Sequence, residues 1–319
     1  MRVLLWHVHG SWTTSFVHGN HEYLLPLLPN RGPDGRGRAR TWDWPAKARE
    51  VAVDALGAEA FDVVVLQRPH ELELLRRWTG LRAGVDIPAV YVEHNAPTDT
   101  APGSRHPMAQ RADIPVVHVT AFNQVMWDCG DAPTWVVEHG VLDSGPLYTG
   151  ARASLGVVVN EPVRRWRVAG TDILLRIAEQ IDVEVYGMGM AELVRRAPQL
   201  TGRVHDDLPQ PRMHAELGSH RAYLHPYRWT SLGLALIEAM TIGQPVLALS
   251  TTEAPEAVPA GAGVVSNDLT TLVQTARRWM HDPEEARQRG AVARQHALQR
   301  YGIRRFLDDW DSVLKEAQR

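Results

Sequence analysis

The segment 229–259 constrains the fold more than any other part of the chain. Thr230 and Ser231, two residue types that favour the N-cap of a helix, precede an almost uninterrupted apolar run over 232–242. Gly243 suits the end of that helix, and the short apolar run that follows predicts a strand. A helix that is apolar on all sides must be buried among other elements. The segment therefore predicts a buried helix–strand unit of an α/β domain.

One carboxylate, Glu238, lies well inside this apolar helix. A buried carboxylate without partners is strongly unfavourable, so Glu238 needs hydrogen-bond donors. A neighbouring backbone group or an arginine could supply them. A vicinal diol fits better, because its two hydroxyls can donate to both carboxylate oxygens, and the ribose of a nucleotide carries such a diol. We expect Glu238 to bind a ribose, with a local pair as the alternative.

The start of the same helix suits a phosphate. The backbone N–H groups of Ser231, Leu232 and Gly233 are expected to be free there, at the positive end of the helix dipole. Gly233 would let a ligand approach the backbone closely. Such a terminus binds anions well. A phosphate here and a ribose at Glu238 together predict a nucleotide diphosphate lying along the helix.

The stretch 233–249, GLALIEAMTIGQPVLAL, resembles the nucleotide-sugar signature of GT-B glycosyltransferases of the family-4 type, which are retaining group 1 enzymes. In that family a glutamate, seven residues and a second glutamate precede a Gly-x-Pro-Val strand. Glu238 matches the second glutamate, which in the family holds the donor ribose. Thr230 stands at the position of the first, which usually touches the donor sugar, so the resemblance places Thr230 at the sugar end of the site.

Length and composition limit the classes of protein. With 319 residues the chain is long enough for two domains, and its formal net charge of −3 argues against a generic nucleic-acid-binding protein. The single cysteine, Cys129, excludes an internal disulfide and fits a reducing cytoplasm. The N-terminus lacks the apolar run of a signal peptide, and no stretch approaches the ~20 residues of a membrane span. We expect a cytoplasmic protein without an integral membrane segment.

The first half of the chain alternates apolar runs with polar turns, as a parallel α/β sheet does. Gly10 follows the first strand, where open sheets place ligands and where family members often have two glycines that admit donor and acceptor. The Gly-, Pro- and Arg-rich segment 30–40 predicts a loop near the acceptor. Trp42 and Trp44 could stack on an acceptor ring or simply pack. We expect strands at 2–8, 61–66, 87–92, 116–119 and 135–138, and helices at 47–56, at 71–78 and from 123 onward.

Histidines mark the ends of two of these strands. His7 and His9 share one strand face, but no acidic ligand accompanies them, so we favour core or cleft histidines and predict no metal site. His94 follows the strand at 87–92. In the family a histidine at this place reaches toward the donor sugar and helps to order the reacting centre. A lone histidine is usually structural, yet the position of His94 at a strand end favours a catalytic role.

The second half begins with an expected linker over 142–154 and a strand at 155–159. Arg164, Arg165 and Arg167 then share one loop, and three arginines at a strand end favour an anion over a solvated basic turn. The family has a Gly-Arg after this strand and a Lys-Gly before the next helix, whose basic side chains grip the diphosphate. Gly170 matches that glycine, Ala169 stands at the lysine position, and Arg164 matches the arginine by spacing. Arg165 and Arg167 are candidate substitutes for the lysine.

The remaining elements follow the same pattern. Gly187 opens a Gly-Met-Gly turn after the strand at 183–186, like the turn that lies near the base in the family. Asp282 can cap a helix that has proline at its first position. We expect further helices at 171–180, 283–300 and 306–315, and a strand at 223–226.

The resemblance implies a GT-B fold, an α/β architecture of two Rossmann-like domains with parallel sheets facing across a cleft. We expect an acceptor-binding domain at 1–148, a nucleotide-sugar-binding domain at 149–300, and a C-terminal helix at 301–319 that returns to the first domain. The expected activity is retaining transfer of a sugar from a UDP- or GDP-sugar to a small-molecule, glycan or lipid acceptor. Arginines and the helix start would stabilise the leaving diphosphate without a required metal, and the leaving phosphate would be the base for the acceptor hydroxyl. No further cofactor is expected.

Two other classes stay open. A non-catalytic nucleotide-sugar-binding protein is favoured somewhat by Thr230 in place of the glutamate, and a GT-B hydrolase or epimerase would use the same nucleotide site. A nicotinamide-dependent dehydrogenase fits poorly, since no Gly-x-Gly-x-x-Gly follows a strand at the N-terminus.

Overall fold

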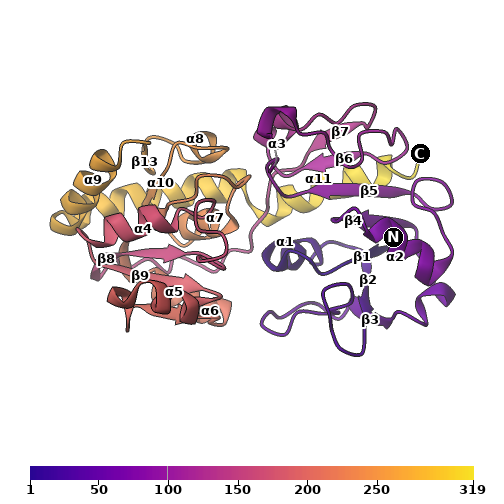
Figure 1. The fold of residues 1–319 in the computed structure, drawn as a ribbon, viewed down its shortest axis with the longest axis horizontal. Helices are drawn as coiled ribbons and strands as arrows, with labels where there is room; N and C mark the ends of the chain where they lie inside the picture. Colours follow the sequence, from indigo (N-terminus) through magenta and orange to yellow (C-terminus); the bar gives the residue numbers. More distant parts are fainter. Residues whose placement is uncertain (99) are drawn as a thin grey trace. The chain divides into compact units, whose positions relative to one another are not determined.

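The computed structural model describes residues 1–98 and 100–319. The chain forms two compact units, one made of residues 1–140 with 303–319 and the other of residues 141–302 (Figure 1). These boundaries lie a few residues from the expected ones at 148 and 300. The functional labels of the two domains, acceptor-binding and donor-binding, stay predictions.

In the described residues of the first unit, seven strands form one sheet in the order β3-β2-β1-β4-β5-β6-β7, with neighbours paired in parallel. All four residues of β4, VVVL, are buried, as expected for a parallel strand that is covered on both faces. The strands are β1 (Arg2–Leu5), β2 (Glu22–Leu27), β3 (Ala48–Ala52), β4 (Val63–Leu66), β5 (Ala89–Glu93), β6 (Val116–His118) and β7 (Thr134–Val136).

The helices described in this unit include the C-terminal one, α11 (Ile303–Glu316). Its apolar face is anchored by an aromatic cluster, in which the Trp310 ring lies 5.5 Å from Trp12 and 5.1 Å from Phe16. The predicted return of the chain end to the first domain is therefore confirmed. The other helices are α1 (Gly10–Phe16), α2 (Glu71–Thr79), α3 (Ala121–Met126) and the 3-10 turns η1 (Leu56–Ala58) and η2 (Ala101–Gly103).

The helix predicted at 47–56 is wrong, because β3 occupies most of this segment at the sheet edge. Its partner, β2, was not predicted at all. Arg49 on β3 donates to Glu22 on β2 at 2.7 Å, so charged side chains of the two strands form a cross-strand ion pair. The pairing is a tertiary contact that the local sequence does not reveal.

The second unit, all of which the structure describes, has a six-stranded parallel sheet in the order β10-β9-β8-β11-β12-β13. The expected linker ends earlier than predicted, because β8 already begins at Arg152. The strands are β8 (Arg152–Val158), β9 (Val183–Gly187), β10 (Val204–Asp206), β11 (His220–His225), β12 (Val246–Ala248) and β13 (Gly263–Val265).

Helices surround this sheet, and the central one, α7 (Leu234–Thr241), is buried over most of its length. Its C-terminal turn packs tightly on α10 (Pro283–Arg300), since a Cβ added to Gly290 would lie 2.0 Å from the Gly243 carbonyl oxygen. The predicted cap of α10 is confirmed, because Asp282 accepts from the Glu285 N–H at 2.9 Å. The others are α4 (Thr171–Ala178), α5 (Met190–Arg196), η3 (Pro198–Leu200), α6 (Gln210–Leu217), α8 (Ala254–Ala257) and α9 (Leu269–His281).

Candidate functional site

The candidate nucleotide site lies at the carboxyl edge of the second sheet. The strand order turns between the neighbouring strands β8 and β11, and such a switch point is where open α/β sheets bind ligands. Three loops follow strands at this edge: 159–170 after β8, 188–189 after β9 and 226–233 after β11. The fold thus places the predicted arginines, Gly187 at the end of β9, and the start of α7 at one edge of the sheet.

The start of α7 differs from the prediction. The helix begins at Leu234, and its N-cap is Gly233 in an extended conformation, so Thr230 and Ser231 are not the caps and Leu232 precedes the helix. A Cβ on Gly233 would lie 2.5 Å from Cε1 of His225, so the absent side chain leaves room for the imidazole ring. The free backbone donors therefore belong to the first helical residues, Leu234 and Ala235.

Glu238 is buried on α7, as predicted, with 7% of its surface exposed. Its partners come from α6: Gln210 donates from Nε2 to one carboxylate oxygen at 3.1 Å, and His214 Nε2 lies 3.3 Å from the other. The local pairing that we gave as the alternative is therefore present, although with different partners. A carboxylate has about four acceptor positions, so each oxygen of Glu238 keeps capacity for a second donor such as a hydroxyl.

Two of the three loop arginines are exposed and engaged with carboxylates. Arg164 pairs with Glu161, and Arg167 donates to Asp172 at 2.7 Å. Asp172 is also held by Arg228, which sequence reasoning missed, through two hydrogen bonds of 2.6 and 2.7 Å. Arg228 thereby ties the loop after β11 to the start of α4.

Arg165 is in a different situation. Its guanidinium lies 5.6 Å from the centroid of the Tyr227 ring, a cation–π distance. No carboxylate of residues 1–98 or 100–319 forms an ion pair with it. Arg165 is therefore the loop arginine that is best placed to give its donors to an anion.

A neutral aromatic pair lies under Arg165. The rings of His225 and Tyr227 stack with centroids 4.7 Å apart, and the Tyr227 hydroxyl donates to the Val158 carbonyl at 3.4 Å. Burial lowers the pKa of His225 to about 3, so the imidazole is uncharged at neutral pH. The stack supports the guanidinium without adding a competing charge.

Two glycines allow the loops to approach each other. Gly170, the N-cap of α4, has φ +71°, and a Cβ there would lie 1.8 Å from the Pro226 carbonyl oxygen. Gly187 has φ +135°, and its Cβ would lie 2.2 Å from the Val159 carbonyl oxygen. Only glycine tolerates both the backbone conformation and the contact at these positions. Contact of Gly187 with a base stays a prediction.

His94, in the first unit, follows β5 and is buried with 8% exposure. Its ring lies 4.0 Å from that of His9 and contacts the edge of Trp12. Gln67 donates from Nε2 to the Trp6 carbonyl at 2.7 Å, so its Oε1 accepts from His94 Nε2 at 3.0 Å. His94 thus carries its proton on Nε2, and Nδ1 holds the lone pair.

The charge of His94 follows from its surroundings. Burial, helped by His9 and His139, lowers the pKa of His94 well below its ordinary value. The ring is therefore neutral near pH 7 and is suited to hydrogen bonding rather than to ion pairing. Its catalytic role stays a prediction.

Gly10 begins α1, and a Cβ there would lie 2.1 Å from Cζ3 of Trp42. The indole of Trp42 therefore covers this glycine. Trp44 is buried and donates from Nε1 to Thr14 at 2.8 Å. Trp44 packs inside the unit, while a role for Gly10 at a ligand stays a prediction.

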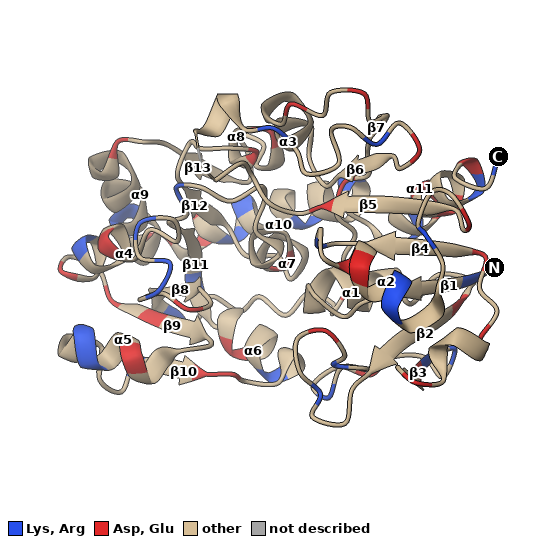
Figure 2. Cartoon of the chain, turned by 45° about the vertical axis from the view of Figure 1, so that its right-hand side comes forward, with Lys and Arg blue, Asp and Glu red and all other residues tan. Residues whose placement is uncertain are grey.

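Within the part of the chain that the structure describes, no group of three His, Cys, Asp or Glu side chains could hold a metal ion. None of the described helices is long and apolar enough to cross a membrane. Basic and acidic side chains are interspersed over the elements (Figure 2), in keeping with the small net charge.

The chain resembles known proteins in part of its sequence and in its fold. Residues 163–282 match the family model of Glycosyl transferases group 1. No curated protein sequence matches the chain. Among solved structures, sucrose-phosphate synthase from Thermosynechococcus elongatus has a TM-score of 0.72 at 13% identity, covering 99% of this chain and 98% of that one.

Two further structures cover the whole length. HepE from Anabaena, solved in complex with UDP, has a TM-score of 0.71 at 15% identity over 99% of this chain and 100% of its own. The lipopolysaccharide outer core galactosyltransferase WaaB, in its apo form, has a TM-score of 0.61 at 12% identity over 99% and 100%. The two parallel-sheet units and these likenesses define a GT-B fold, as predicted. The match to Glycosyl transferases group 1 lies within the second unit, and the solved structures share the fold of the whole chain.

Proposed function

We propose that the chain transfers a sugar from a nucleotide-diphosphate sugar to an acceptor hydroxyl with retention of the anomeric configuration. The observation that carries this proposal is Glu238, a carboxylate buried on α7 that keeps acceptor positions for a ribose diol. Arg165 and the first N–H groups of α7 lie on loops of the same sheet edge and suit a diphosphate.

The nucleotide of the donor is UDP in our proposal, with GDP as the alternative. Crystal structures of HepE, a protein of the same fold, are described as complexes with UDP and with UDP-glucose. The donor would be bound by the second unit and the acceptor by the first, in the cytoplasm, where nucleotide sugars are available.

The proposed chemistry breaks the bond between the sugar C1 and the β-phosphate oxygen and forms a bond between C1 and the acceptor oxygen. The acceptor proton passes to the leaving phosphate. Arg165 and the α7 start would stabilise the negative charge that develops there, which requires no metal. The neutral His94 would position the sugar through a hydrogen bond.

A non-catalytic role is favoured by one observation, Thr230, which stands where the family has a glutamate. Incubation with UDP-glucose and related donors, followed by proton NMR of the anomeric signal, tests both ideas. Release or transfer of the sugar with unchanged anomeric configuration supports the enzyme. Binding of the donor with no release over long incubation supports the binding protein, and release that generates the inverted anomer contradicts retention.

The same assay tests the position of Thr230. Thr230→Glu restores the residue of the family, and a change in the ranking of donor sugars would support contact with the sugar end. An unchanged ranking would place residue 230 outside the sugar site.

A further inference from the structure

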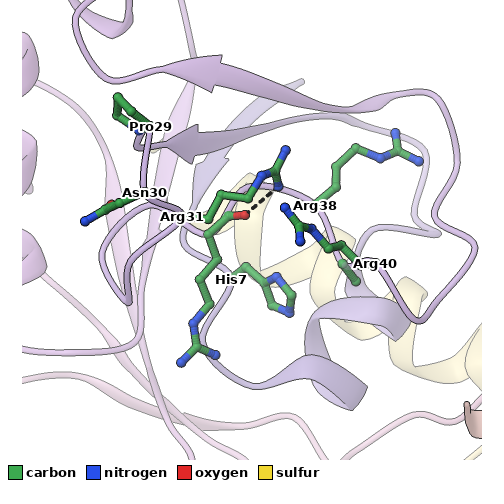
Figure 3. Close-up of a pocket in the computed structure, with 8 residues that line it drawn as sticks. His7, Pro29, Asn30, Arg31, Arg38 and Arg40 are labelled. Atoms are coloured by element: carbon green, nitrogen blue, oxygen red, sulfur yellow. Dashed lines mark hydrogen bonds between the residues drawn. The ribbon is translucent and has the colours of Figure 1, made fainter. Parts of the chain in front are cut away.

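A pocket in the first unit is lined by arginines. It has a volume of about 440 Å³ and is bordered by the loop after β2 and by His7 at the end of β1 (Figure 3). Four of its eight lining residues are arginines, namely Arg31, Arg36, Arg38 and Arg40, and none is acidic. A pocket of this size can hold a small ligand rather than only an ion.

Two of the four arginines hold the loop. Arg31 forms a double hydrogen bond with Glu50 on β3, at 2.8 and 3.0 Å, and donates to the Arg36 carbonyl at 2.9 Å, the bond drawn in Figure 3. Arg38 donates to the backbone carbonyls of Pro45 at 3.1 Å and Ala48 at 2.6 Å. These contacts fix the backbone of the loop on β3.

The other two arginines are available. Arg36 and Arg40 are exposed, and in the described residues neither guanidinium has a hydrogen-bond or ion-pair partner. The Glu50 carboxylate, which could have neutralised them, is taken by Arg31 and by the Arg38 N–H at 2.8 Å. The pocket therefore presents two uncompensated positive charges on an anchored loop.

His7 lines the same pocket and adds no negative charge to it. Its Nδ1 is 3.1 Å from the Gly37 carbonyl oxygen, so Nδ1 carries the proton and Nε2 can accept a hydrogen bond. Burial, opposed by that carbonyl and helped by Arg36, lowers the pKa of His7. A neutral imidazole that can accept from a hydroxyl, next to guanidiniums that bind anions, suits a hydroxylated anion.

We propose that this pocket binds the phosphomonoester of the sugar acceptor, with Arg36 and Arg40 as its phosphate ligands. Two guanidiniums match the double charge of a monoester and its several acceptor oxygens, which a singly charged carboxylate matches less well. The identity of the ligand as the acceptor rests on the proposed function, whereas binding of phosphate at this loop does not.

The test measures phosphate binding by calorimetry with the full chain, first alone and then with saturating UDP, which occupies the proposed diphosphate site of the second unit. We expect inorganic phosphate and glucose 6-phosphate to bind, and glucose not to bind. The double variant Arg36→Gln/Arg40→Gln should weaken phosphate binding at least tenfold. The control Arg76→Gln/Arg77→Gln makes the same change in charge on α2, outside the pocket, and should bind as the parent does.

Equal phosphate affinity in both double variants, or none in the parent, would overturn the proposal. Glucuronate bound as tightly as glucose 6-phosphate would overturn the assignment to a phosphomonoester. Sedimentation with vesicles that contain phosphatidic acid distinguishes a lipid phosphate from a soluble one. If the parent sediments with the vesicles and the pocket variant does not, the ligand is a lipid phosphate. If neither protein sediments, the ligand is a soluble phosphomonoester. Failure of UDP to bind while phosphate binds would remove the proposed function and leave the phosphate site standing.

Discussion

The guanidinium of Arg165 lies 5.6 Å over the ring of Tyr227, while its neighbours Arg164 and Arg167 are paired with Glu161 and Asp172. The same loop thus contains arginines of two kinds. Arg164 and Arg167 already donate hydrogen bonds to carboxylates, so they have fewer free N–H donors for a ligand than Arg165, which lies over the Tyr227 ring.

The first prediction compares these arginines. Arg165→Gln should weaken UDP binding about tenfold or more, because a charge-assisted hydrogen bond contributes roughly 1.5–3 kcal/mol. Arg164→Gln is the matched control in the same loop and should change the affinity for UDP little. Calorimetry with UDP and uridine checks this, since only the diphosphate should be affected. Equal losses for Arg164 and Arg165, or for UDP and uridine, would count against the assignment.

The second prediction concerns His94, which belongs to the first unit. His94→Ala should lower turnover by about 10²-fold, as expected for a positioned polar catalytic group. The affinity for UDP should stay within about threefold, or ~0.7 kcal/mol, because the proposed nucleotide contacts all lie in the second unit. His94→Gln, whose amide offers both an N–H donor for Gln67 and an acceptor oxygen in place of Nδ1, should recover part of the rate. Transfer at the parent rate by His94→Ala would show that this histidine only packs.

A third prediction tests the approach of two loops. Gly170→Ala should destabilise the protein by more than about 1 kcal/mol, because the added Cβ meets the Pro226 carbonyl at 1.8 Å. Gly202 is a suitable control: its φ of +77° is similar, and a Cβ there would meet nothing within 4 Å. The difference between Gly170→Ala and Gly202→Ala in urea denaturation isolates the contact from the backbone strain. Equal losses would mean that the loops are not in contact.

Buried histidines predict how stability depends on pH. Burial lowers the pKa of His118 and of His220 to about 4, and that of His225 to about 3. Unfolded histidines titrate near 6.5, so below this pH the unfolded state binds more protons than the folded state. The free energy of unfolding therefore decreases as the pH is lowered. The histidine contribution is complete above about pH 7 and is lost progressively as the pH drops from about 6.5 toward 4.

Urea denaturation at about pH 7.5 and pH 5 measures this loss. His118→Gln removes one titrating group and should reduce the difference between the two values. A variant with the same pH dependence as the parent would contradict the neutral, buried state of His118.

The sequence predicts much of the fold where one signal dominates. Unbroken apolar runs identify β4, β5 and β8, and Asp282 followed by proline marks the start of α10. The signal fails for β2 and β3. β2 contains Pro26, which is rare inside a sheet, and β3 carries charges whose partners lie on other elements.

The site shows the same division. The burial of Glu238 follows from the apolar helix around it. Its partners Gln210 and His214 come from α6, a helix that we did not predict from the local sequence. The pairing of Arg228 with Asp172 likewise joins two loops that are far apart along the chain. The start of α7 lies later than Thr230 and Ser231 predict, at Gly233, where a side chain would clash with His225 on β11, a contact that the local sequence does not reveal.

The most direct test of the central claim is calorimetric titration of Glu238→Gln with UDP. The amide keeps the shape of the side chain, so the protein should stay folded, while the loss of the charge should weaken UDP binding by roughly 1.5–3 kcal/mol. Titration with 2′,3′-dideoxy-UDP, which lacks the diol, should then give the same low affinity for the parent and the variant. An affinity for UDP that is unchanged by Glu238→Gln would contradict ribose binding by this carboxylate, and with it the nucleotide site on α7.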